Sequence, residues 1–198
     1  MTTMTAIEEV TSRAMPPDVP DDLAQRVEAM LVSASRPCTA GAIAQALGLR
    51  AEDDAVARVE SVIEMLNEEY EQTGRSFRVT RVAGGYRVMT LARFASDIVS
   101  MLGARESSKL SKAALETLAI VAYQQPVTRA RLEAIRGVAC GEVLRSLIEK
   151  KLLAIAGRAE EPGRPLLYAT SKRFLEVFGL ASIRDLPRID ELPTGESE

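Results

Sequence analysis

The side chains most often used in catalysis are scarce in this sequence. Its 198 residues include no histidine and only two cysteines, Cys38 and Cys140. The lack of histidine excludes histidine-based triads, histidine metal sites and the most common general base at neutral pH. Both cysteines lie near predicted helix starts, where a thiolate is stabilised, but two isolated cysteines match neither a disulfide framework nor a zinc site. We interpret both as small residues without a chemical role.

Phosphate-binding motifs are also missing. The sequence contains no G-x-x-x-x-G-K-[ST], no G-x-G-x-x-G and no paired C-x-x-C, which are common signatures of nucleotide, dinucleotide and zinc binding. Carboxylate, lysine and cysteine chemistry stay open, and a cysteine-dependent enzyme is a third alternative. We predict a protein that is not an enzyme, with no catalytic residue, no cofactor, no metal and no small-molecule substrate.

Composition favours a globular, mainly helical chain. Hydrophobic residues make up 46% of the sequence, which is typical of folded proteins. Aromatic residues make up only 4% and tryptophan is absent, so we expect aliphatic cores and helices rather than a β-sandwich. No apolar run approaches the ~20 residues that span a bilayer, and the first 20 residues do not resemble a signal peptide. We expect a cytoplasmic protein without a membrane partner.

Between two polar ends, the predicted elements occur twice in the same order. Hydrophobic spacing and helix-capping residues predict three helices in each half. A pair of β-rich runs follows in each half, and the first pair is joined at Gly84-Gly85, which suits a two-residue hairpin turn. A short helix then ends each half. The helices are expected at 21–35, 39–48, 53–72 and 91–102 in the first half, and at 111–125, 128–137, 141–152 and 172–178 in the second.

The two halves align without a gap around their second helices. RPCTAGAIAQALGL matches QPVTRARLEAIRGV, with a proline before the helix, a capping threonine (Thr39 or Thr128) and a glycine (Gly48 or Gly137) that permits the left-handed exit. Three helices followed by a hairpin form a winged helix, a variant of the helix-turn-helix. We predict a mainly α protein with small β-hairpin wings (α+β), built from two tandem winged-helix domains. The predicted boundaries are a flexible N-terminal tail at 1–20, domain 1 at 21–103, a linker at 104–110, domain 2 at 111–180 and a C-terminal tail at 181–198.

Charge decides whether this fold is expected to bind DNA. Lys and Arg at phosphates supply most of the nonspecific affinity for a duplex. The third helix of domain 1, the expected recognition helix, carries seven acidic residues and one basic residue, Arg58, so a DNA groove would repel it. Residues 111–180 contain 11 basic and 7 acidic residues without a concentrated basic stripe. We predict at most weak direct DNA contact, in domain 2, and a protein-interaction role.

Several residues of domain 2 are candidates for partner contact. Tyr123 and Gln124 could contact a partner, or could simply end a helix. Arg136 could bind a carboxylate, or only interact with the dipole of its helix. Arg158 and Arg164 flank the hairpin loop and could bind a carboxylate or a phosphate, or could be solvated arginines of a turn.

Aromatic residues near the end of domain 2 complete the candidate set. Phe174 and Phe178 are four residues apart and share one helix face. That face is expected to belong mostly to the core, and would be an interaction patch if it were exposed. Tyr168, in the second hairpin, is the remaining candidate. The first helix of this domain is expected to place four residues in the core, Leu115, Leu118, Ala119 and Ala122.

Long segments of the chain resemble one bacterial family, segregation and condensation protein B (ScpB). In the second half these are LSKAALETLAIVAYQQPVTRARLEAIRGV, GRAEEPGRPLLYATSKRFLEVFGL and DLP, and in the first half LGL and LNEEYEQTGRSFRVTRVAGGYRVMT. The resemblance extends from about Asp22 to Pro187. The departures are Ala139-Cys140, where the family often has a polar pair, and Gln124, where arginine is common. Either departure could alter a contact made at the start of the third helix.

The resemblance implies a non-enzymatic homodimer, formed chiefly through domain 1. It implies that the dimer binds the central region of the kleisin ScpA, and through ScpA the ATPase SMC, in chromosome condensation and segregation. It also implies a cytoplasmic, nucleoid-associated protein. The alternative is a winged-helix DNA-binding transcriptional regulator, which would bind duplex DNA with a steep salt dependence.

Overall fold

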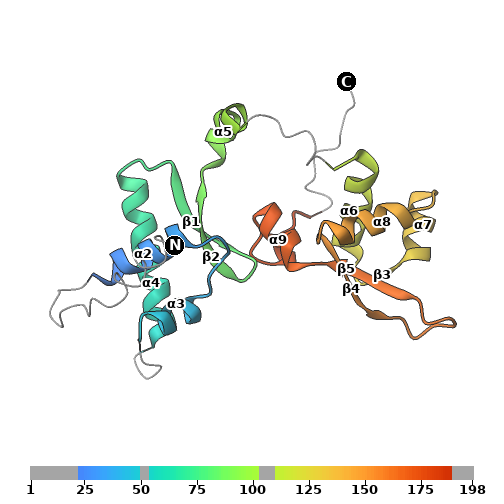
Figure 1. The fold of residues 1–198 in the computed structure, drawn as a ribbon, viewed down its shortest axis with the longest axis horizontal. Helices are drawn as coiled ribbons and strands as arrows, with labels where there is room; N and C mark the ends of the chain where they lie inside the picture. The colour runs from blue at the N-terminus through green and yellow to red at the C-terminus, as the bar shows by residue number, and fades with distance from the viewer. Residues whose placement is uncertain (1–21, 50–53, 103–109, 189–198) are drawn as a thin grey trace, which may run out of the picture.

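Two hydrophobic cores organise the chain, one in each half of the sequence (Figure 1). The structure, a computed structural model, describes residues 22–49, 54–102 and 110–188. The predicted N-terminal tail lies outside these ranges, as does all of the predicted linker except Leu110. Within the described residues, no helix is both long enough and apolar enough to cross a membrane.

The first half contains three helices, an antiparallel hairpin and a short helical end. Its apolar core consists of one face of each helix and the inner face of the hairpin, with Val27, Ile43, Val59 and Val79 at its centre. In chain order the elements are α2 (Leu23–Ser33), α3 (Ala40–Ala46), α4 (Ala55–Gln72), β1 (Phe77–Val82), β2 (Gly85–Thr90), η2 (Ala92–Phe94) and α5 (Ala95–Leu102).

Local signals in the sequence explain where these helices begin and which face they bury. The hydroxyl of Thr39 accepts a hydrogen bond from the Ala42 amide at 3.2 Å, which confirms the predicted cap of α3. Along α4 the buried residues follow a helical period, but Val56, whose spacing fits the same period, is exposed. Its neighbour Ala55 occupies the buried face instead.

The first hairpin turns one residue earlier than predicted. Val82 pairs with Gly85, so the turn residues are Ala83 and Gly84, with φ of 51° and 76°, rather than Gly84-Gly85. Gly85 begins β2 and is needed for a different reason. A Cβ there would lie 3.0 Å from the backbone of Cys38, which exchanges backbone hydrogen bonds of 2.9 and 2.7 Å with Tyr86.

The second half repeats the helix–helix–helix–hairpin order and adds one short strand. Val127–Thr128 pairs with the second strand of the hairpin, giving an antiparallel sheet of order β3-β5-β4. Thr128 caps α7 as predicted, and Ser111 caps α6. Gly137 and Gly179 follow their helices with φ of 71° and 67°. The elements are α6 (Lys112–Gln124), β3 (Val127–Thr128), α7 (Arg129–Arg136), α8 (Gly141–Glu149), β4 (Leu153–Arg158), β5 (Leu166–Thr170), α9 (Lys172–Phe178) and η4 (Ile183–Asp185).

The two matching halves confirm the predicted fold class, a mainly helical chain with small antiparallel hairpins in a tandem winged-helix arrangement. The described residues from 22 to 102 form the first module, and residues 110–188 form the second module.

The end of the second module differs from the prediction of a C-terminal tail that begins at residue 181. Ser182 and Asp185 form a capping box around η4, and Ile183 and Leu186 pack against the second core. The physical reason is that these two apolar side chains find buried surface beside α6. Residues 189–198 of the predicted tail lie outside the described residues.

We predict that Gly85→Ala destabilises the protein. The added methyl group must displace the Pro37–Cys38 backbone, and overpacking of this kind typically costs about 1–3 kcal/mol. Urea denaturation would measure the loss in free energy of unfolding. Gly41→Ala, in α3, is the matched control, because the added Cβ would meet its nearest neighbour at 4.0 Å and alanine has the higher helix propensity. Equal stability of Gly85→Ala and the wild type would contradict the prediction.

Candidate partner-binding surface

Tyr123 and Gln124 lie in the last turn of α6 but have different surroundings. Tyr123 is half-buried, and its hydroxyl donates a hydrogen bond to the Pro187 carbonyl at 2.8 Å. With Ile183 and Leu186 it lines a shallow depression. Gln124 is exposed. Tyr123 therefore holds the end of the described chain against α6, while Gln124 faces solvent.

The next residue, Gln125, has a structural role that the sequence analysis missed. Its side-chain oxygen accepts hydrogen bonds from the amide and the hydroxyl of Thr170, at 2.7 and 2.9 Å. Its side-chain nitrogen donates to the Ala122 carbonyl at 3.3 Å. Gln125 thus connects the end of α6 to the end of β5. No local pattern signals a contact between residues so far apart in the sequence.

Arg136 is engaged within the second module. Its guanidinium forms an ion pair with Glu116 of α6 at 3.1 Å, and its side chain is only 8% exposed. The pair joins α7 to α6, so little of Arg136 is available to a partner.

Arg158 and Arg164 come together at the tip of the second hairpin. The Arg158 guanidinium donates to the Arg164 carbonyl at 3.1 Å, and Arg164 has a φ of 43°. Both side chains are exposed, and the ion pairs found among the described residues involve neither. The loop also exposes Glu160 and Glu161. The tip therefore presents two arginines in a mixed-charge environment.

The aromatic candidates divide between core and surface. Phe174 is 3% exposed and Phe178 is 46% exposed, and their ring centroids are 4.6 Å apart. Val177 beside them is also exposed. The expectation that this face belongs mostly to the core holds for Phe174 and is wrong for Phe178, because one turn of helix carries the second ring past the edge of the core. Tyr168 is half-buried in β5 and pairs with both flanking strands.

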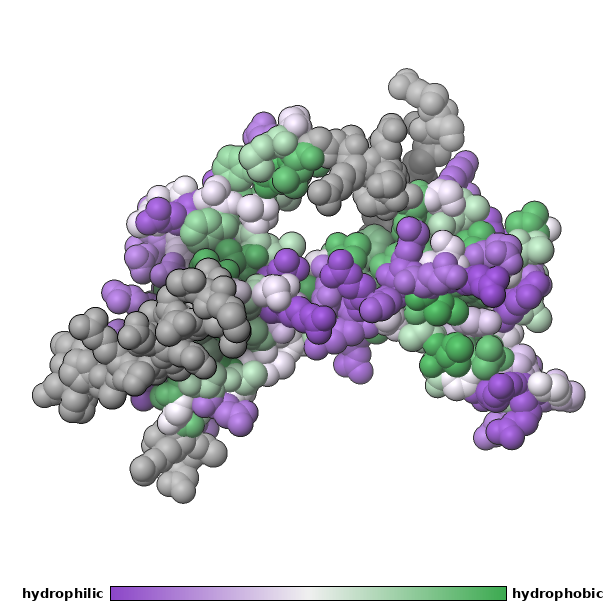
Figure 2. Space-filling view, in the orientation of Figure 1, coloured by the Kyte–Doolittle hydropathy of each residue, from purple (hydrophilic) through white to green (hydrophobic). Residues whose placement is uncertain are grey.

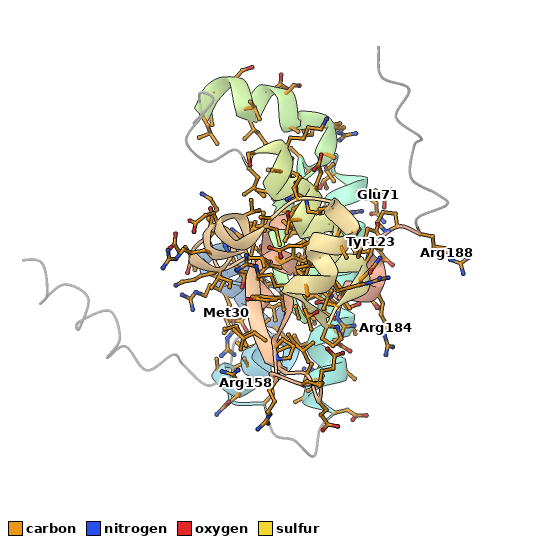
Figure 3. The ribbon with its side chains drawn as sticks, turned by 90° about the vertical axis from the view of Figure 1, so that its right-hand side faces the viewer. Met30, Glu71, Tyr123, Arg158, Arg184 and Arg188 are labelled. Atoms are coloured by element: carbon orange, nitrogen blue, oxygen red, sulfur yellow. The ribbon has the colours of Figure 1, made fainter. Side chains whose placement is uncertain are left out.

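The candidates do not converge on one site. Tyr123 and Arg158 lie at well-separated places on the molecule (Figure 3), and Arg136 is largely covered. Of the candidate residues, Phe178 has an exposed apolar side chain, and its ring packs against the buried ring of Phe174.

The second module also exposes apolar residues on α6, on α7 and after α7. Leu115, expected in the core, is 48% exposed, and Ala119, also expected there, is exposed. Ile135 and Val138 are exposed as well. Ala114 and Leu118 occupy the buried face of α6, which turns Leu115 outward. Because α6 is apolar over most of its circumference, its periodicity does not show which residue faces solvent.

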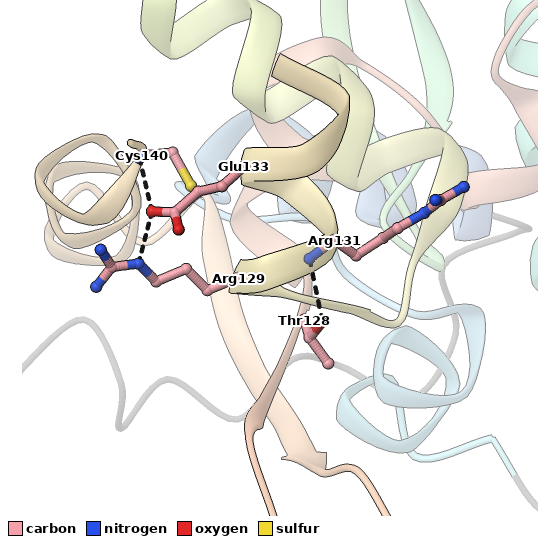
Figure 4. Close-up of polar contacts among 5 residues, drawn as sticks. All are labelled: Thr128, Arg129, Arg131, Glu133 and Cys140. Carbon is pink, nitrogen blue, oxygen red and sulfur yellow. Dashed lines mark hydrogen bonds and ion pairs between the residues drawn. The ribbon is translucent and has the colours of Figure 1, made fainter. Parts of the chain in front are cut away.

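A polar cluster around Cys140 explains why this thiol is structural (Figure 4). One carboxylate oxygen of Glu133 accepts hydrogen bonds from the Cys140 amide at 3.0 Å and from the Arg129 guanidinium at 2.8 Å. The Cys140 side chain is buried, and burial raises the pKa of its thiol. The thiol is thus held neutral. Nowhere in the described ranges do three or more His, Cys, Asp or Glu residues form a group that could hold a metal ion.

Comparison with known proteins identifies the relatives of the chain. The family model described as "Segregation and condensation complex subunit ScpB" matches residues 25–189. The chain is 45% identical to segregation and condensation protein B of Syntrophotalea carbinolica, covering 87% of this chain and 85% of that protein. For the protein of the same name from Moorella thermoacetica the identity is 40%, with 92% and 90% covered. Among solved structures, ScpB from Mycobacterium tuberculosis is 35% identical, with 83% of this chain and 99% of that chain covered and a TM-score of 0.39.

We predict that Glu133→Gln makes stability less dependent on acid pH. The Cys140 amide, and then Arg129, lower the pKa of the Glu133 carboxyl. The stabilisation is therefore present above the unfolded pKa of about 4.3 and is lost as pH falls through the lower folded pKa. The urea midpoint of unfolding would be measured over about three pH units around that value. As pH decreases, the midpoint should fall less steeply in the variant than in the wild type. Glu160→Gln, in the exposed hairpin loop, is the control, and equal slopes for Glu133→Gln and the wild type would refute the role of this carboxylate.

Proposed function

Because the chain belongs to the ScpB family of segregation and condensation complex subunits, we propose that it is the non-enzymatic adaptor of an SMC–ScpA–ScpB complex. Two copies associate as a homodimer, and the dimer binds the central region of the kleisin ScpA and, through it, SMC. The complex acts in chromosome condensation and segregation, in the cytoplasm and at the nucleoid. The observation that carries the proposal is the family match over residues 25–189.

The face of α9 is the proposed anchor point for ScpA. Phe178 and Val177 are exposed there, and Phe174 supports the Phe178 ring from the core. A rigid aromatic side chain loses little conformational entropy on binding, and such residues often dominate interface energies. Arg158 and Arg164, exposed at the hairpin tip, supply guanidinium groups for carboxylates of the partner. A partner segment with apolar anchors fits the face of α9, and a separate acidic segment of the partner fits the hairpin tip.

Helix α5 is the proposed contact between two copies. It has no buried residue, although Val99, Met101 and Leu102 are large and apolar, and Met101 is 77% exposed. The apolar surface over α5 is visible in Figure 2. A concentration of exposed apolar side chains on one short helix is typical of an association surface. Its position in the first module agrees with dimerisation through that module.

The alternative function, DNA-binding regulation, has less support. Glu64, Glu68 and Glu71 are exposed along α4, and Glu60 accepts a hydrogen bond from Tyr86 at 3.0 Å. These carboxylates would approach the phosphates if α4 entered a groove. A mobility-shift assay separates the two functions, since tight, sequence-selective retardation of duplex DNA without ScpA would favour the regulator.

We predict that Phe178→Asp weakens binding of the cognate ScpA by about tenfold or more, or about 1.4 kcal/mol. The charge would have to be buried against the partner at the proposed anchor point. Isothermal titration calorimetry with the full chain measures the affinity, and circular dichroism verifies folding. Leu115→Asp is the matched control, because Leu115 is similarly exposed on a different helix, α6. Unchanged affinity for Phe178→Asp would reject the α9 anchor, and no binding of wild-type protein at micromolar ScpA would reject the proposed function.

We also predict that the double substitution Val99→Asp, Met101→Asp converts the dimer to a monomer. Two charges on α5 would oppose its burial between copies. Light scattering coupled to size-exclusion chromatography gives the mass directly. Val32→Asp, on exposed α2 surface, should leave the mass unchanged. A dimeric double variant would show that the copies associate elsewhere.

A further inference from the structure

The turn of the first hairpin forms backbone hydrogen bonds to the second module. The Ala83 amide donates to the Leu180 carbonyl at 2.8 Å, and the Gly84 amide donates to the Ala181 carbonyl at 3.1 Å. In Figure 1 the tip of the β1–β2 hairpin meets the chain that follows α9. The central amides of a two-residue turn usually face water, so two consecutive bonds to consecutive carbonyls are a specific contact.

Two apolar side chains, those of Val82 and Met89, accompany these hydrogen bonds. Val82 is 0% exposed, although it lies next to the turn. Side chains alternate along a strand, so Val82 points to the opposite face from Val79, which packs in the first core. The end of the Met89 side chain also reaches the second module, since a Cβ at Gly179 would lie 3.8 Å from it. The contact is therefore both polar and apolar.

Each side of the contact is fixed to its own core. On the first module, the β1–β2 ladder and the pairing of Cys38 with Tyr86 hold the hairpin in place. On the second module, the Leu180 amide donates to the Leu175 carbonyl at 3.0 Å, and Leu180 packs against the second core. If one module moved relative to the other, the two backbone hydrogen bonds would therefore break, because neither side of the contact could move with the other.

We propose that residues 179–181 are a docking surface for the turn of the first hairpin, and that this docking holds the two modules in one orientation. The occupant is the Val82–Gly84 turn of the same chain. Its two left-handed residues present both amides on one side, and its small side chains allow close approach to the acceptor carbonyls.

Docking also fixes the surroundings of the α9 anchor, a consequence that rests on the proposed function. The exposed residues Val177 and Phe178 immediately precede the docking surface. A kleisin segment anchored at α9 would thus bind beside a first module whose position is already set. In a dimer formed through the first modules, docking would hold the two α9 faces at a fixed separation.

Hydrogen exchange measured by NMR on the full chain tests the docking directly. We expect the Ala83 and Gly84 amides to exchange at least ~10-fold more slowly than the amide of Gly163 in the exposed loop of the second hairpin. Exchange of all three amides at the same rate would overturn the proposal. This measurement does not depend on ScpA, so failure of docking and failure of the proposed function are distinguishable.

A substitution provides the second test. Val82→Asp places a charge in the buried contact, whereas Arg81→Asp changes an exposed neighbour on the same strand and is the control. ¹⁵N relaxation should give one common rotational correlation time for both modules in the wild type and in Arg81→Asp. It should give two different times in Val82→Asp. Different times in the wild type would also overturn the proposal, and this outcome remains decisive if Val82→Asp fails to fold.

Discussion

Burial of aliphatic side chains between three helices and one hairpin is the interaction on which both modules depend. Each hairpin has one face to cover, and each core is small, so the helices and strands are further connected by polar contacts. Asn67 of α4 donates to and accepts from the backbone of Val79 at 2.9 and 2.8 Å, which covers part of the open edge of β1. Gln125 performs a comparable role between α6 and β5.

Polar contacts at the edge of each core fix the relative orientation of the elements that pack there. The Tyr70 hydroxyl donates to Glu28 at 2.7 Å and so joins α4 to α2, while burial and this carboxylate raise the pKa of the phenol. In the second module, Arg136 joins α7 to α6 through Glu116. Glu133 satisfies the first amide of α8 and an arginine at once. These charged residues beside the cores therefore serve the fold.

The two modules use the same plan with different surfaces. The first has an acidic third helix and an exposed apolar α5, and its hairpin tip is occupied by the chain after α9. The second has a free hairpin tip with two arginines and an exposed ring on α9. The proposed contact between two copies rests on the surface of the first module, and the proposed contact with ScpA rests on that of the second.

Local physics made much of this fold predictable from the sequence. Capping hydroxyls at Thr39, Ser111 and Thr128, and glycines such as Gly137 and Gly179, act within a few residues of themselves. Helix starts and ends, the order of elements and the repeated winged-helix plan were therefore readable in advance. The acidic character of α4 was also a property of the sequence alone.

Tertiary structure decided which apolar side chains face solvent and which distant segments meet. Leu115 and Phe178 have ordinary core spacing, yet both are exposed. Ala114 and Leu118 occupy the buried face of α6, and Phe178 lies one helical turn beyond the edge of the core. Gln125 and Thr170, and the hairpin turn and Leu180, meet across long separations in sequence. Such contacts depend on how whole elements pack, because an apolar side chain gains free energy of burial only in proportion to the area that a neighbouring element removes from water.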